Sequence, residues 1–96
     1  MRKEYILFVL KQYKLFLMKK YSVKRIGLFG SYAINKEKKE SDIDIYVEFY
    51  NKNFHNVAGL WNFLERKLKK RIDLVYSHSF SNKKIIESIK RKVIYG

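Results

Sequence analysis

The chain has 96 residues, enough for one domain over residues 1–96 and too few for two. Apolar residues make up 47% and aromatic residues 17%, a composition that excludes a disordered tail. The net charge of +13 can attract an anionic partner such as nucleic acid, but a lysine-rich composition with solvated helix faces explains it equally well. The absence of cysteine excludes a disulfide framework and fits a cytoplasmic location.

The first predicted element is a helix over residues 2–20. Apolar residues recur there at helical spacing on more than one face, so we expect heavy burial, with part of the surface covered by a partner protein or a second copy. Lysines interrupt the apolar stretch before it could span a bilayer, and no membrane segment is predicted.

Three strands and two further helices follow. Residues 23–29 form a short apolar run and residues 42–49 alternate strictly, so both are predicted as strands, with a charged loop over 36–40 between them. Asn53 is expected to cap the second helix, residues 72–76 to form a third strand, and residues 77–82 to lead into the last helix. The apolar stripes expected on these two helices are Phe54, Val57, Ala58, Trp61, Leu64 and Leu68, and then Ile85, Ile86, Ile89 and Val93.

This order, α-β-β-α-β-α, predicts an α+β fold in which helices pack against a small mixed sheet.

The only three aspartates of the chain lie on the predicted strands. Since side chains alternate between the faces of a strand, Asp42 and Asp44 share one side, with Cα atoms about 6.6 Å apart. Their carboxylates can therefore converge on metal ions spaced about 3.5 to 4 Å. Asp73 begins a strand that would supply a third ligand by pairing beside them. Three crowded carboxylates need cations between them, and oxygen ligands suit Mg²⁺ or Mn²⁺.

Gly30 and Ser31 follow the strand over 23–29 and precede a segment that can form a helical turn. Glycine lets the backbone approach a phosphate closely, a serine hydroxyl can donate a hydrogen bond, and a helix N-terminus offers free N–H groups. A Gly-Ser pair by itself is an ordinary turn. With the aspartates downstream, it indicates a cradle for a nucleoside triphosphate.

The chain closely resembles the DNA polymerase β-like nucleotidyltransferase superfamily in two segments separated by a fixed interval. These are Gly27-Leu28-Phe29-Gly30-Ser31-Tyr32-Ala33 and Ser41-Asp42-Ile43-Asp44, with ten residues between Ser31 and Asp42. Its length and its strand Arg71-Ile72-Asp73-Leu74-Val75 resemble the minimal nucleotidyltransferase (MNT) group, over nearly the whole chain. Many MNT proteins are antitoxins paired with HEPN ribonuclease toxins.

The resemblance implies a role for each candidate residue. Gly30 and Ser31 would hold the β- and γ-phosphates, Asp42 and Asp44 would bind two Mg²⁺ ions, and Asp73 would complete the metal site and help to activate the acceptor. The implied reaction moves a nucleoside monophosphate, AMP from ATP, onto a tyrosine of a HEPN toxin, so that the chain acts as an antitoxin.

Two features depart from the family pattern. Ile34 and Asn35 stand where many relatives carry Arg-Gly, although Lys36, Lys38 and Lys39 nearby can supply positive charge. We expect no additional helical domain of the kind that larger members carry, so a partner or a second copy is expected to supply those contacts.

Two alternative functions fit the same residues. The fold can neutralise a toxin by surface contact alone, with aspartates that are only structural. The basic surface can instead bind nucleic acid, in which case affinity falls steeply with salt and needs neither metal nor nucleotide.

Overall fold

The computed structural model describes residues 1–76 and 83–96 and confirms the α+β class with a small mixed sheet. The predicted connection over 77–82 lies outside the described residues. The elements are α1 (Lys3–Gln12), α2 (Lys14–Tyr21), β1 (Val23–Phe29), α3 (Gly30–Ala33), β2 (Ile43–Phe49), α4 (Phe54–Leu68), β3 (Ile72–Val75), α5 (Lys83–Lys92) and β4 (Ile94–Tyr95).

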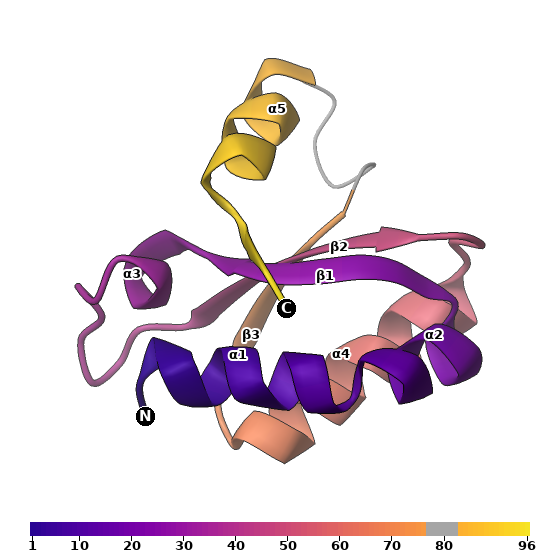
Figure 1. Cartoon of the computed structure of the whole chain (residues 1–96), viewed down its shortest axis with the longest axis horizontal. Helices are drawn as coiled ribbons and strands as arrows, with labels where there is room; N and C mark the ends of the chain where they lie inside the picture. Colours follow the sequence, from indigo (N-terminus) through magenta and orange to yellow (C-terminus); the bar gives the residue numbers. More distant parts are fainter. Residues whose placement is uncertain (77–82) are drawn as a thin grey trace.

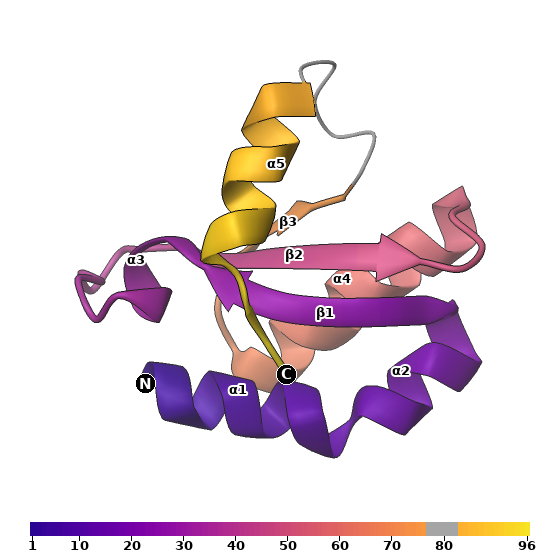
Figure 2. The ribbon, with the colours of Figure 1, turned by 45° about the horizontal axis from the view of Figure 1, so that its top comes forward.

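The described strands form one sheet in the order β3-β2-β1-β4 (Figures 1 and 2). β1 pairs antiparallel with both β2 and β4, whereas β2 and β3 run parallel. A parallel pair needs a crossover connection, which α4 supplies. The two-residue strand β4 was not predicted, because two residues are too few to show an alternating pattern.

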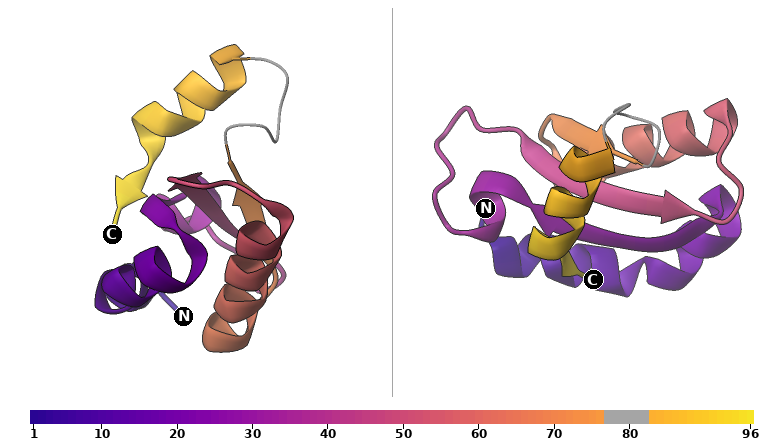
Figure 3. Two further views of the ribbon diagram at one scale, coloured as in Figure 1. Left: turned by 90° about the vertical axis from the view of Figure 1, so that its right-hand side faces the viewer. Right: turned by 90° about the horizontal axis from the view of Figure 1, so that it is seen from above.

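The two faces of the sheet have different coverings. Figure 3 shows α1, α2 and α4 against one face and α5 on the other side. Along β2, the buried residues Ile43, Ile45 and Val47 point to the three helices, while Asp44 and Glu48 have the opposite parity and are half-buried. The candidate carboxylates therefore lie on the face away from the main core.

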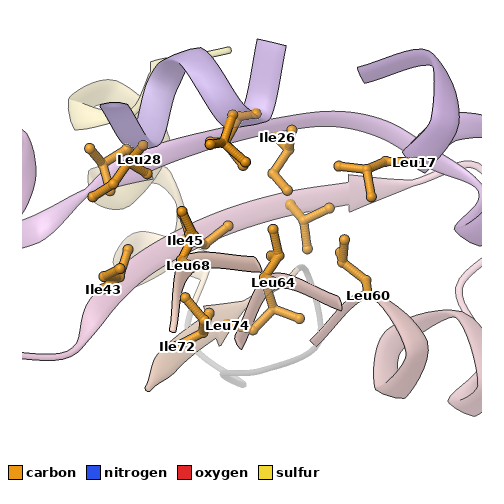
Figure 4. Packing of buried hydrophobic residues seen from close by; sticks show 14 of the residues in the cluster. Leu17, Ile26, Leu28, Ile43, Ile45, Leu60, Leu64, Leu68, Ile72 and Leu74 are labelled. Carbon is orange, nitrogen blue, oxygen red and sulfur yellow. The ribbon is translucent and has the colours of Figure 1, made fainter. Parts of the chain in front are cut away.

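The core lies between the sheet and helices α1, α2 and α4 (Figure 4). Its stability comes from close-packed aliphatic side chains removed from water. The labelled members are Leu17, Ile26, Leu28, Ile43, Ile45, Leu60, Leu64, Leu68, Ile72 and Leu74.

Two helices differ from the predictions. The single helix expected over 2–20 is divided at Tyr13, whose ring packs edge-on against Phe63 of α4 with 5.3 Å between centroids. Asn53 caps α4 as predicted, since its side chain accepts a hydrogen bond from the Asn56 N–H at 2.8 Å. The expected stripe is wrong at its first member. The Phe54 ring points away from the core and is 87% exposed, whereas Leu60, which the stripe did not include, is buried.

The last helix, α5, has no buried residue. Ile85 is 43% exposed, and Val93 follows the helix instead of belonging to it. The apolar side predicted for this helix is present in the sequence but is not buried within the described chain. None of the helices in the described ranges has both the length and the apolarity to cross a bilayer.

Candidate active site

Asp44 and Asp73 are neighbours across the parallel strand pair. Their Cα atoms are register partners, so both side chains leave the sheet on the face opposite to the main core. Asp42 lies just before β2, is exposed, and has its Oδ1 4.0 Å from Nε of Arg71. The fold thus brings Asp44 and Asp73 together and places Asp42 at the edge of the pair.

The carboxyl group of Asp44 is electrostatically unfavourable in its charged form. Partial burial, the negative charge of Asp73, a hydrogen bond with Asp73 and the charge of Asp42 together raise the pKa of Asp44 from 3.8 to about 6. A proton held between two neighbouring carboxylates relieves their repulsion. Cations are expected to do this in the loaded site, and below about pH 6 a proton on Asp44 does it in the metal-free protein.

The donor set fits a hard divalent cation. Two adjacent carboxylates, one with a raised proton affinity, offer oxygen ligands of the kind that Mg²⁺ and Mn²⁺ take. Within the described residues, no three His, Cys, Asp or Glu side chains are already gathered closely enough to hold a metal ion. Asp42 would have to turn away from Arg71 to join Asp44 and Asp73.

Gly30 lies directly against the carboxylate of Asp44. Its φ of 75° is in the left-handed region, and a Cβ at this position would overlap Oδ2 of Asp44. Phe29, the residue before it, is the register partner of Asp44 in the antiparallel β1–β2 pair. The start of α3, with Ser31, is therefore fixed beside the Asp44–Asp73 pair by the sheet itself.

The segment that links α3 to β2 is held by polar contacts. Asn35 has a φ of 59°, and asparagine is one of the few residues other than glycine that adopt this conformation readily. Asn35 thus adopts here the left-handed conformation that glycine favours. The Lys70 ammonium donates to the Lys39 carbonyl oxygen at 2.9 Å and brings positive charge to this segment, a contact between distant residues that the sequence did not reveal.

A cleft of about 540 Å³ opens beside the two exposed aspartates. It lies between α4 and β3, where Trp61 is half-buried and packs against the core, as predicted. The same side chain also faces the cleft, which the helical spacing did not reveal. The lining residues are Asp42, Ala58, Trp61, Asn62, Glu65, Arg71, Ile72 and Asp73.

The far end of the same sheet face carries a second polar cluster. Glu48 accepts hydrogen bonds from the Tyr46 hydroxyl at 2.8 Å and from Arg25 at 3.2 Å, and Lys90 of α5 lies 3.8 Å away. Burial opposes the charge of Glu48, but the hydrogen bonds from Arg25 and Tyr46 outweigh it and lower the pKa of this carboxyl. The cluster ties α5 to the sheet and lies apart from the aspartates.

Comparison with known proteins identifies relatives over most of the chain. Residues 11–96 match the family model described as polymerase beta, nucleotidyltransferase. MJ1379 of Methanocaldococcus jannaschii, a candidate protein adenylyltransferase, is 41% identical over 90 residues, which cover 91% of this chain and 90% of the relative. The protein adenylyltransferase MntA of Thermococcus cleftensis is 36% identical over 74 residues, covering 76% of this chain and 74% of MntA.

Solved structures show the same fold. A candidate minimal nucleotidyltransferase superposes with a TM-score of 0.79 at 27% identity, covering 98% of this chain and 95% of that one. An MNT antitoxin complex with a tri-AMPylated HEPN toxin of Shewanella oneidensis matches with a TM-score of 0.61 at 21% identity, over 93% of this chain and 70% of the matched chain.

Proposed function

Because the chain belongs to the polymerase beta nucleotidyltransferase family, we propose that it transfers AMP from ATP to a hydroxyl group of a partner protein and releases pyrophosphate. The observation that carries the proposal is the placement of Asp44 beside both Asp73 and Gly30. Two relatives support the choice of AMP as the transferred group and of a protein as the acceptor. They are the protein adenylyltransferase MntA and the candidate protein adenylyltransferase MJ1379.

In the proposed reaction the acceptor oxygen forms a bond to the α-phosphorus of ATP. The bond from that phosphorus to the oxygen bridging to the β-phosphate breaks, and pyrophosphate leaves. Asp73 is more exposed than Asp44 and lines the cleft, so it is the carboxylate that takes the proton of the acceptor hydroxyl. Gly30 and Ser31 bind the β- and γ-phosphates through the half-buried start of α3.

Asp42, Asp44 and Asp73 are the residues that would hold divalent cations in this site. Bound Mg²⁺ or Mn²⁺ would neutralise the charge that develops on the phosphate oxygens. The lysines of the α3–β2 segment, together with Lys70, surround the same region with positive charge that favours a triphosphate.

We assign the acceptor to a HEPN-type toxin, with a tyrosine as the modified residue and the chain as its antitoxin. The support is the fold shared with an MNT antitoxin that occurs in complex with a tri-AMPylated HEPN toxin. The rival is neutralisation by contact, in which the same surface binds the toxin without chemistry.

Co-expression with the HEPN toxin separates the two mechanisms. The catalytic proposal predicts that wild-type chain protects cells and that Asp44→Asn, expressed at an equal level, does not. Protection by Asp44→Asn, with unmodified toxin by intact mass, would show that contact alone is sufficient. As the matched control, Asn53→Ala lies at the N-cap of α4, away from the aspartates, and should protect as wild type does.

A further inference from the structure

The strand that carries Asp73 is short and lies at an edge of the sheet. β3 has four residues and pairs with β2 on one side only. On that side the Ile43 N–H donates to the Arg71 carbonyl oxygen at 3.0 Å. Because backbone groups of successive residues point to opposite sides of a strand, the N–H and C=O of Ile72 point away from β2.

Both outward groups of Ile72 are bound by side chains of α4. The Trp61 indole Nε1–H donates to the Ile72 carbonyl oxygen at 2.8 Å, and the Ile72 N–H donates to Oε2 of Glu65 at 3.0 Å. Trp61 and Glu65 are four residues apart and therefore share one face of the helix. We call this pair of contacts the Trp61–Glu65 brace.

We infer that the Trp61–Glu65 brace sets the position of Asp73 beside Asp44, so that Trp61 and Glu65 are positioning residues for the reaction proposed above, on which this inference rests. Ile72 directly precedes Asp73, and its side chain is 4% exposed within the core. The strand is thus fixed by β2 on one edge and by the brace on the other. Trp61 and Glu65 also line the cleft that Asp73 lines.

The brace affects the position of Asp73 and not only the stability of the fold, because it binds the backbone of Ile72, the residue before Asp73. A small rotation of an edge strand moves its side chains relative to the neighbouring strand, and a displacement of about 1 Å at a reacting group can lower a rate up to about 100-fold. Gly30 and Ser31 belong to α3, which follows β1 and makes no hydrogen bond with the brace within the described residues, and should remain in place. Loss of the brace should therefore lower kcat and leave the KM for ATP nearly unchanged.

Three variants and one control test this inference. Trp61→Phe removes the N–H donor and keeps an aromatic ring, Glu65→Leu removes the acceptor and keeps the bulk, and Glu65→Gln restores an acceptor oxygen. Asn53→Ala weakens the same helix at its N-terminal cap, far from Asp73 in sequence. The activity readout is transfer of label from ATP labelled at the α-phosphate to the acceptor in an extract of the source cells.

The structural readout is nuclear magnetic resonance of the metal-free, nucleotide-free protein. It gives amide hydrogen exchange along β3 and the carboxyl carbon shifts of Asp44 and Asp73. Trp61→Phe and Glu65→Leu should lower kcat about tenfold, keep the KM for ATP within about twofold, speed exchange at Ile72 and change both carboxyl shifts. Glu65→Gln should restore wild-type values, and Asn53→Ala should keep kcat and both shifts.

Two results would overturn the inference. One is unchanged carboxyl shifts and exchange in both Trp61→Phe and Glu65→Leu. The other is a fall in kcat that Asn53→Ala reproduces at an equal loss of stability. Failure of the wild-type protein to label any acceptor would instead refute the proposed function, and the carboxyl shifts would still show whether the brace places Asp73 beside Asp44.

Discussion

The Cα of Gly30 lies so close to the Asp44 carboxylate that no larger residue fits at position 30 without moving Asp44. The contact joins the proposed phosphate-binding turn to the proposed metal ligands. Gly30 also has a positive φ of 75°, a conformation that residues with a Cβ adopt only at a cost in free energy. One backbone position thus links two parts of the site that are separated by the α3–β2 segment.

Gly30→Ala should therefore damage both the fold and the activity. The left-handed conformation and the overlap with Asp44 should cost about 1 to 3 kcal/mol in the free energy of unfolding. Transfer of label from ATP should fall about 100-fold or more, because Asp44 must move. Urea unfolding and the labelling assay measure the two effects, and a Gly30→Ala protein with wild-type activity would show that this contact is dispensable.

Asp44→Asn should abolish transfer and yet stabilise the metal-free protein. At neutral pH the charged Asp44 is penalised by burial and by its neighbours, which is why its pKa is raised to about 6. Removing the charge should increase the free energy of unfolding by about 1 kcal/mol, after allowance for solvent screening of a half-exposed group.

The pH dependence of this gain has a definite sign. Well below pH 3.8, the carboxyl is protonated in folded and unfolded chains, and Asp44→Asn should have no effect. As the pH rises from 3.8 to about 6 the unfolded chain loses its proton first, so the wild type loses stability relative to the variant. Urea denaturation in a chelator, from pH 3.5 to 7.5, checks this, and a variant that is less stable than wild type at pH 7 would contradict it.

Glu48 lies on the same strand as Asp44, but its contribution to stability should change with pH in the opposite direction. Although burial opposes its charge, hydrogen bonds from Arg25 and Tyr46 lower its pKa below the ordinary value of 4.5. Its contribution is therefore present above pH 4.5 and is lost as the pH falls through the lowered pKa. Glu48→Gln should cost about 1 kcal/mol at pH 7 and nothing under strongly acidic conditions, while labelling activity is retained. Loss of labelling with intact stability would instead place Glu48 in the reaction.

Alanine substitutions at two residues of α4 should differ sharply in their effect on the free energy of unfolding. Leu64 is fully buried, and Leu64→Ala should lower the free energy of unfolding by about 2 to 5 kcal/mol. Phe54 is 87% exposed, and Phe54→Ala should change it by less than about 0.5 kcal/mol. Chemical denaturation of both variants measures this, and a large loss for Phe54→Ala would mean that its ring is covered in solution.

The sequence predicts the parts of this fold that have a local pattern. β1 was predicted at its observed bounds, because a short apolar run that ends before Gly30 is a strong local signal. Strand alternation placed Asp42 and Asp44 on one side, with Asp73 beside them if the two strands paired. β2 and β3 do pair, and the structure shows that Asp73 is the register partner of Asp44. The family signature supplied the candidate roles of these residues.

Features that depend on tertiary placement could not be predicted. The bend at Tyr13 follows from packing against Phe63, which is fifty residues away in the chain. Trp61 had the spacing of a core residue, and its hydrogen bond to Ile72 arises only when α4 lies along the edge of the sheet. Helical periodicity shows which residues share a face of the helix. It cannot show where that face extends beyond the core, as it does at Phe54.

The most direct test of the central claim is transfer from ATP labelled in parallel at the α- or the γ-phosphate. Purified chain is incubated with Mg²⁺ and an extract of the source cells, beside Asp42→Asn/Asp44→Asn as the inactive control and Asn53→Ala as the matched folded control. Adenylyl transfer predicts one protein band that retains the α-label only and requires both aspartates. A band that retains the γ-label, or no band although a HEPN-type partner co-purifies, would contradict it.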